Sequence, residues 1–308
     1  MEYIGPFAFN GIRFILGSLS LFPLIAIRSK YFKNNRQNNT YFYAFAAGTC
    51  CFIAVTFQQL GIIFTTAGNA GFITGLYVVL TPIMGILLGR KTGKATWIGT
   101  IFTLTGLYLI SAAGHMDRIN PGDILIAIGA VFWAVHVLLI DSFVKKTDPI
   151  ILSSGQFLVC GIYSLIAAFL IEPFMADWLN KIQYQTNVSG LIEWSPMPHL
   201  VHGLFSGTVP LDFISGAAVP VLFGGLASVG IAYTLQVVAQ KNAPPAHATI
   251  ILCLEGCFAV LGGIIVLNES PGTWTVPGFA LMLTGMLISQ WEVIAGPQRQ
   301  EHILKNSN

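Results

Sequence analysis

Charge is what this chain has least of. Of its 308 residues, 9% are charged and 54% are hydrophobic, and the mean hydropathy is +0.72. Soluble globular domains carry about 25% charged residues, so the composition excludes an ordinary soluble protein. It predicts an all-α, polytopic membrane protein with the lipid bilayer as its main partner, because backbone polar groups in lipid must be satisfied within helices.

Signatures of several function classes are also missing. The sequence has no Gly-x-x-x-x-Gly-Lys-Ser/Thr loop for ATP and no His-Glu-x-x-His pair for zinc. All five cysteines fall within apolar runs, where disulfides and zinc sites are not expected. The basic residues form only short clusters between apolar runs. We therefore expect no enzymatic activity, cofactor, metal or nucleic-acid partner. The oligomeric state is open, with a homodimer as one alternative.

What the chain does have is a series of long apolar runs. Nine of them are long enough to cross the ~30 Å hydrocarbon core of a bilayer: 6–27, 41–63, 69–89, 95–113, 122–143, 150–171, 213–239, 244–267 and 273–291. Most Lys and Arg residues of the connections lie on one side of these spans. The positive-inside rule then predicts a cytoplasmic C-terminus in the cell's inner membrane.

The chain also contains a weak internal repeat. The stretch 6–26 resembles 149–169, and Thr81-Pro82 falls on Glu255-Gly256. The triplet Leu104-Thr105-Gly106 falls on Leu283-Thr284-Gly285. The run 122–143 precedes the second copy and has no counterpart before the first. The repeating unit is therefore predicted to hold five helices, and an odd number gives two copies of opposite orientation, as in many secondary transporters.

This repeat predicts the domain organisation. The first copy covers 1–113 with four helices, its own first helix being absent. The second copy covers 114–291 and carries an extracytoplasmic insertion at 172–212. A cytoplasmic tail follows at 292–308.

Short motifs placed in order along these runs resemble the EamA-type permeases of the drug/metabolite transporter superfamily. The patches are Gly5-Pro6-Phe7 with Arg13-Phe14, Asn69-Ala70-Gly71 with Leu80-Thr81-Pro82, Gly122-Asp123 with Phe132-Trp133-Ala134, and Leu254-Glu255 with Leu267-Asn268-Glu269. The resemblance implies ten helices in an inverted 5+5 repeat and a central cavity for amino acids, other metabolites or drugs. The chain departs from the family pattern in lacking the first helix and in having Gly256 after Leu254-Glu255.

Three ionisable residues within the apolar runs are candidates for the site. A carboxylate at the depth of Glu255 costs roughly 2.5–3.5 kcal/mol in lipid, so it should face protein or a water-filled cavity. There it would exchange a proton, bind an ammonium group or hold a neighbouring helix. Arg13 would bind a carboxylate or phosphate, or extend to the outer interface. His136 would relay protons or form an interhelical hydrogen bond.

Uncharged groups at membrane depth complete the predicted site. Trp133 would cap a cavity or pack in the core. The polar side chains either line a cavity or hold helices together; they are Gln58, Gln59, Tyr77, Tyr233 and Gln236. Pro82 lacks a backbone N–H and is predicted to kink its helix.

These observations predict a secondary transporter, a permease or exporter, for small polar metabolites such as amino acids, working by alternating access. Two alternatives stay open. One is a non-transporting, truncated family member or a half-partner that needs another chain. The other is an intramembrane lipid-modifying enzyme, which the scattered positions of the acidic residues disfavour.

Overall fold

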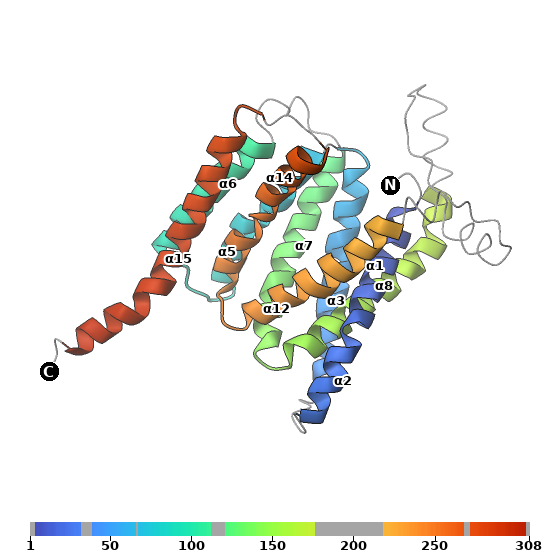
Figure 1. Ribbon diagram of the computed structural model, residues 1–308, viewed down its shortest axis with the longest axis horizontal. Coiled ribbons are helices and arrows are strands. Elements are labelled where there is room, and N and C mark those ends of the chain that lie inside the picture. The colour runs from blue at the N-terminus through green and yellow to red at the C-terminus, as the bar shows by residue number, and fades with distance from the viewer. Residues whose placement is uncertain are drawn as a thin grey trace. The chain divides into compact units, whose positions relative to one another are not determined.

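The computed structural model describes residues 4–31, 39–65, 67–111, 121–175, 218–267 and 272–305. In these ranges the chain forms helices and no strand, which confirms the all-α class (Figure 1). Most of the insertion predicted at 172–212 lies outside the described residues.

The chain divides into two compact units. Unit 1 comprises Met1–Thr56 and Ser142–Lys241, and unit 2 comprises Phe57–Asp141 and Asn242–Asn308. Each unit takes helices from both predicted repeats, and two long helices, α3 and α7, contribute to both units. The repeat boundary at 113 stays a prediction, because a division by compactness does not test it.

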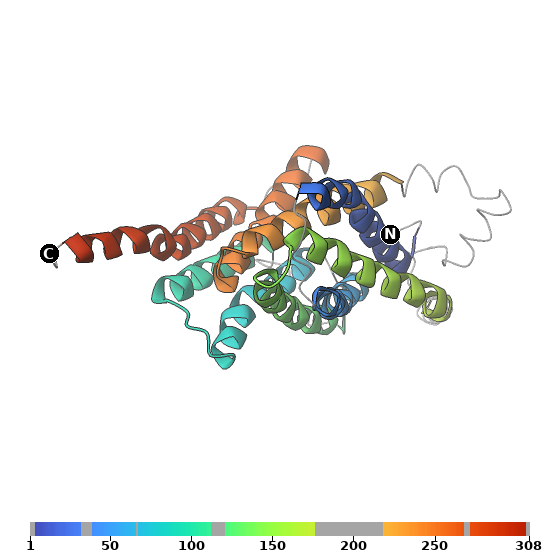
Figure 2. The same ribbon diagram turned by 90° about the horizontal axis from the view of Figure 1, so that it is seen from below.

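Unit 1 is built from α1 (Pro6–Ser20), α2 (Phe22–Tyr31), most of α3 (Thr40–Ile62), α8 (Pro149–Leu170), the π-helix η1 (Phe223–Tyr233) and α12 (Thr234–Gln240). Unit 2 is built from α4 (Ala67–Gly75), α5 (Tyr77–Leu87), α6 (Lys94–Ser111), most of α7 (Pro121–Val144), α13 (Pro245–Leu252), α14 (Glu255–Leu267) and α15 (Thr275–Lys305). Figure 2 shows the same helices from below.

Six of the nine predicted spans are confirmed as helices of membrane length and hydropathy: Pro6–Arg28, Thr40–Ile62, Asn69–Leu87, Pro121–Val144, Pro149–Leu170 and Ala218–Gln240. The predicted span 95–113 coincides with α6. The predicted span 244–267 is interrupted between α13 and α14. The predicted span 273–291 lies within α15, which continues to Lys305. The count of nine therefore stays a prediction.

In unit 1, α1 packs against α8 through small residues. A β-carbon added at Gly11 would lie 2.6 Å from a methyl carbon of Leu165. The hydroxyl of Ser18 donates to the Ser154 carbonyl at 2.9 Å. The N-terminus of α1 is capped from a distance, because the Glu172 carboxylate accepts from the amides of Phe7 and Ala8, both at 2.8 Å.

In unit 2, α6 and α15 form an antiparallel pair that lies side by side in Figure 1. Gly99 faces Gly285, and Gly106 faces Gly278. A β-carbon added at any of these four glycines would lie within 2.8 Å of the opposing carbonyl oxygen, so only glycine permits the close approach. The offset in residue number that matches Leu104-Thr105-Gly106 with Leu283-Thr284-Gly285 also matches Gly99 with Gly278.

Two helices of unit 2 are interrupted in mid-course. The first is interrupted at Leu76, between α4 and α5, and the second at Cys253 and Leu254, between α13 and α14. At both places an amide bonds three residues back instead of four: Leu76 to the Ile73 carbonyl at 3.2 Å, and Leu254 to the Ile251 carbonyl at 3.0 Å. The two interruptions therefore share the same local hydrogen bonding, while the predicted match of Thr81-Pro82 with Glu255-Gly256 stays a prediction.

The kink predicted at Pro82 stays a prediction. Pro82 lies inside α5, and the interruption precedes it at Leu76. Proline removes only the amide that would bond to the carbonyl of residue 78. Gly75 is a poor helix former, and a β-carbon there would lie 2.0 Å from a methyl carbon of Leu107. The close approach of α6 therefore coincides with the break.

Candidate functional site

The two interrupted helices meet at their interruptions. The Cys253 thiol donates to the Gly75 carbonyl, with 3.8 Å between sulfur and oxygen. In a regular helix that carbonyl would accept from the amide of Val79, but Val79 bonds to Leu76 instead at 3.0 Å. Tyr77, the first residue of α5, also forms a hydrogen bond with the Cys253 thiol. A carbonyl, a thiol and a phenol therefore lie together at the crossing.

Glu255 stands at the same crossing, and its predicted place against protein or a water-filled cavity stays a prediction. Its side chain is exposed, and it is the first residue of α14. The carboxylate interacts electrostatically with Cys253. Because the helix ends at Leu252 and begins again at Glu255, the carboxylate gains stabilisation from the N-terminal end of a helix dipole without being buried.

A chain of hydrogen bonds leads from α7 towards the crossing. The indole N–H of Trp133 donates to the side-chain oxygen of Gln58 at 3.1 Å. The amide of Gln58 donates to the Thr74 hydroxyl at 3.4 Å. Thr74 precedes Gly75, so this chain connects the predicted residue Trp133 to the residue whose carbonyl accepts from Cys253.

His136 extends this polar group by one helical turn. Its ring lies 5.7 Å from the Trp133 ring in an edge-on arrangement, and the residue is 4% exposed. The neighbouring Gln59 is also buried. Among the polar residues predicted for the site, unit 2 therefore brings together Trp133, His136, Tyr77 and Glu255 along one path of contacts.

The remaining predicted residues lie in unit 1. The guanidinium of Arg13 lies 5.1 Å from the Phe9 ring and 5.2 Å from the Phe14 ring, a cation–π geometry that stabilises a charge away from water. The Tyr233 ring packs 6.2 Å from that of Phe14. Gln236 lies on α12 and is partly buried.

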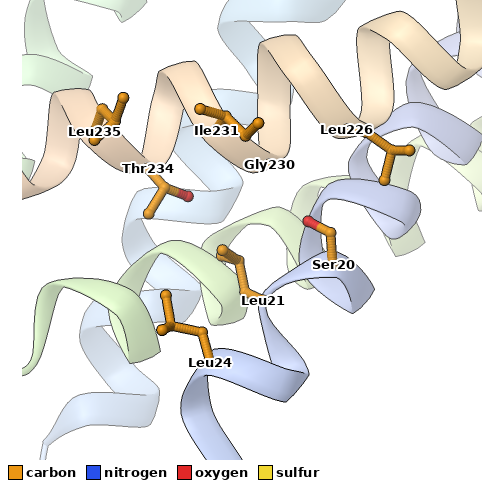
Figure 3. A pocket seen from close by; sticks show the side chains of 8 residues that line it. All are labelled: Ser20, Leu21, Leu24, Leu226, Gly230, Ile231, Thr234 and Leu235. Atoms are coloured by element: carbon orange, nitrogen blue, oxygen red, sulfur yellow. The ribbon is translucent and has the colours of Figure 1, made fainter. Parts of the chain in front are cut away.

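Unit 1 also contains an apolar groove of about 430 Å³ between α1–α2 and η1–α12. Figure 3 shows its lining, which is mainly aliphatic with the hydroxyls of two residues: Ser20, Leu21, Leu24, Leu226, Gly230, Ile231, Thr234 and Leu235. Within this lining Gly230 packs closely on Ser20, since a β-carbon at Gly230 would lie 2.5 Å from the Ser20 hydroxyl oxygen. This lining suits an apolar chain and not a polar solute.

Sequence reasoning missed two residues of the crossing. Thr74 lies in an apolar run without a distinctive spacing. Cys253 was considered only as a disulfide or zinc candidate, which its apolar run disfavours. Within the described ranges, no group of three or more His, Cys, Asp and Glu side chains is placed to hold a metal ion.

The model of the EamA-like transporter family matches residues 1–112 and 120–290. This chain belongs to the EamA-like transporter family. Together with the six membrane-length helices, this makes it a multi-pass membrane transporter.

Individual relatives agree with that assignment. The chain is 28% identical over 270 residues to an uncharacterized transporter of Archaeoglobus fulgidus, covering 87% of this chain and 71% of that protein. It is 24% identical over 309 residues to the uncharacterized transporter YwfM of Bacillus subtilis, covering 97% and 88%. A shorter match, 26% over 106 residues and 34% of each chain, is to the uncharacterized inner membrane transporter YedA of Escherichia coli.

A solved crystal structure also resembles this one. It superposes with a TM-score of 0.67 over 93% of this EamA-family chain and 89% of the other chain, at 16% sequence identity. At that identity the match supports the fold alone.

Proposed function

We propose that this EamA-family protein is a secondary transporter of small polar metabolites, amino acids among them, and that it works by alternating access. The observation that carries the proposal is the crossing of two interrupted helices, each restarting with a polar residue, Tyr77 in α5 and Glu255 in α14. Interrupted helices near the middle of the membrane provide substrate and ion sites in secondary transporters.

The proposed role of Glu255 follows from its position. A carboxylate at the start of a half-helix, exposed and beside a phenol and a thiol, can pair with a substrate ammonium group or carry a proton. The Trp133–Gln58–Thr74 chain would hold α7 and α4 in register while the solute is bound. The interruptions at Leu76 and Leu254 would serve as hinges, because hydrogen bonds already shifted to shorter spacing are the weakest of each helix.

The antiparallel α6–α15 pair supports an inverted repeat as the frame for this movement. One constant offset in residue number matches Gly99 with Gly278 and Gly106 with Gly285. In the structure Gly99 contacts Gly285 and Gly106 contacts Gly278, as expected for two copies of opposite orientation. The inner-membrane name of the relative YedA and the positive-inside pattern favour the cytoplasmic membrane with a cytoplasmic C-terminus. Labelling of a cysteine at the C-terminus by an impermeant reagent from each side tests that orientation.

The decisive experiment is transport by the full chain in proteoliposomes, with a panel of radiolabelled amino acids and related metabolites. We expect uptake or counterflow of at least one solute, and a loss of at least about tenfold in Glu255→Gln, since a hydrogen bond to a charged group contributes roughly 1.5–3 kcal/mol. Glu301→Gln, in the last turns of α15, is the matched control and should transport normally. Absence of movement for the whole panel would instead favour a non-transporting member.

A further inference from the structure

Sulfur-bearing side chains gather at one place in the core of unit 2. The chain has five cysteines and seven methionines. Two of each belong to a single cluster: Cys253, Cys257, Met282 and Met286. Met282 and Met286 are four positions apart in α15, which places them on the same face of that helix. Cys253 lies at the interruption that follows α13, and Cys257 lies in the first turn of α14. The cysteines come from the interrupted α13–α14 segment, and the methionines come from α15.

The two pairs are in contact. The Cys257 thiol donates to the Met282 thioether sulfur, with 3.5 Å between the sulfur atoms. Cys253, Cys257 and Met282 are buried, at 5%, 7% and 0% exposure. Met286 is partly buried and packs against the same cluster. The cysteines are free thiols, so all four sulfurs retain their lone pairs.

We propose that Cys253, Cys257, Met282 and Met286 form a binding site for a soft monovalent metal ion of the Cu(I) type. Thiolate and thioether sulfur select Cu(I) over harder ions. The absence of three or more His, Cys, Asp and Glu side chains around a common point in the described ranges disfavours zinc, which prefers nitrogen, thiolate and carboxylate ligands.

The charge balance suits the surroundings. Cu(I) binding by one thiolate replaces one proton, and the second thiol and the two thioethers bind as neutral donors. The complex is then uncharged, so it adds no net charge to a low-dielectric core, where an isolated ion is costly. Binding would join the interrupted helix to α15 directly beside the crossing.

The test is a titration of the purified full chain with Cu(I), under argon with ascorbate, against a chromophoric Cu(I) chelator. We expect one high-affinity equivalent and release of one proton. Met282→Leu with Met286→Leu keeps the core volume and removes two of the proposed ligands. It should weaken binding by at least about 10- to 100-fold, the loss that follows when only the outer-shell partners of metal ligands are removed. Cys253→Ser with Cys257→Ser should abolish the high-affinity equivalent.

The matched control is the other thiol pair of the chain. Cys51 and Cys160, in unit 1, are both fully buried and hydrogen-bonded to each other. Cys51→Ala with Cys160→Ala should bind Cu(I) as the native protein does. Native affinity in the methionine variant, or loss of the metal in this control, would overturn the proposal and leave the four sulfurs as packing groups. The readout needs no transport, so it is independent of the proposed transport function.

Discussion

Unit 2 contains two helix contacts of opposite character. The α6 and α15 helices are regular, and their glycines allow the two backbones to approach closely. A β-carbon added at these glycines would lie only 2.5–2.8 Å from the opposing carbonyl oxygen. Where α5 meets α13, both helices are interrupted, and a backbone carbonyl is left to accept from a side chain. The difference indicates that the first contact is scaffold, while the second brings polar groups together at two backbone interruptions.

The largest expected effect tests the scaffold. Gly106→Leu would place side-chain atoms where even a β-carbon lies 2.5 Å from the Gly278 carbonyl oxygen, so we expect loss of folded, monodisperse protein in size-exclusion chromatography. Gly106→Ala should cost about 1–3 kcal/mol, as overpacking of a dense interior does. Gly262→Ala is the control, since nothing lies within 4 Å of its added β-carbon. A stable Gly106→Leu protein would contradict the scaffold assignment.

The next effect concerns how the end of α5 is anchored. Arg90 pairs with Asp141, whose side chain is 1% exposed, and Gly89, at φ 76°, ends the helix so that Arg90 can turn towards α7. Removing one partner of a buried pair costs about 3 kcal/mol or more, so Arg90→Ala should lower the unfolding temperature markedly.

The double variant Arg90→Leu with Asp141→Leu should recover much of that loss, because no charge is left uncompensated. Equal destabilisation in the single and double variants would mean that packing, and not charge, anchors α5.

A smaller effect is expected from the hydrogen-bond chain at the crossing. Trp133→Phe removes the donor to Gln58 and should cost about 1 kcal/mol of stability. We expect solute affinity to fall by a few-fold, because the chain that positions α4 is broken. Trp274→Phe, at a residue that is 53% exposed, should leave both unchanged. Unaltered transport in Trp133→Phe would show that these hydrogen bonds play no part in solute binding.

The smallest effect is expected at Pro82. Because the interruption lies at Leu76, Pro82→Ala should leave transport within about twofold of the native rate and should not lower stability, since alanine restores an amide inside α5. Uptake assays and thermal unfolding of the same preparation measure both. A strong loss of transport would show that Pro82, inside α5, controls the movement after all.

Much of the fold follows from the apolar runs, because length and hydropathy are sufficient to predict helices in lipid. The interruptions do not follow, since they depend on contacts such as that of Gly75 with Leu107, which no local pattern records. Among the site residues, Trp133 and His136 could be identified from the sequence because they are polar side chains one helical turn apart in an apolar run. Thr74 and Cys253 could not, because their partners come from distant helices.

The cap on α1 has a consequence for how the chain is made. The amides of Phe7 and Ala8 find their acceptor in Glu172, some 165 residues later. At about 5–20 residues per second of synthesis, that carboxylate emerges on the order of ten seconds or more after the helix start it serves. During that interval the first helix has an open end, so this native contact of unit 1 must form after α8 has been synthesised.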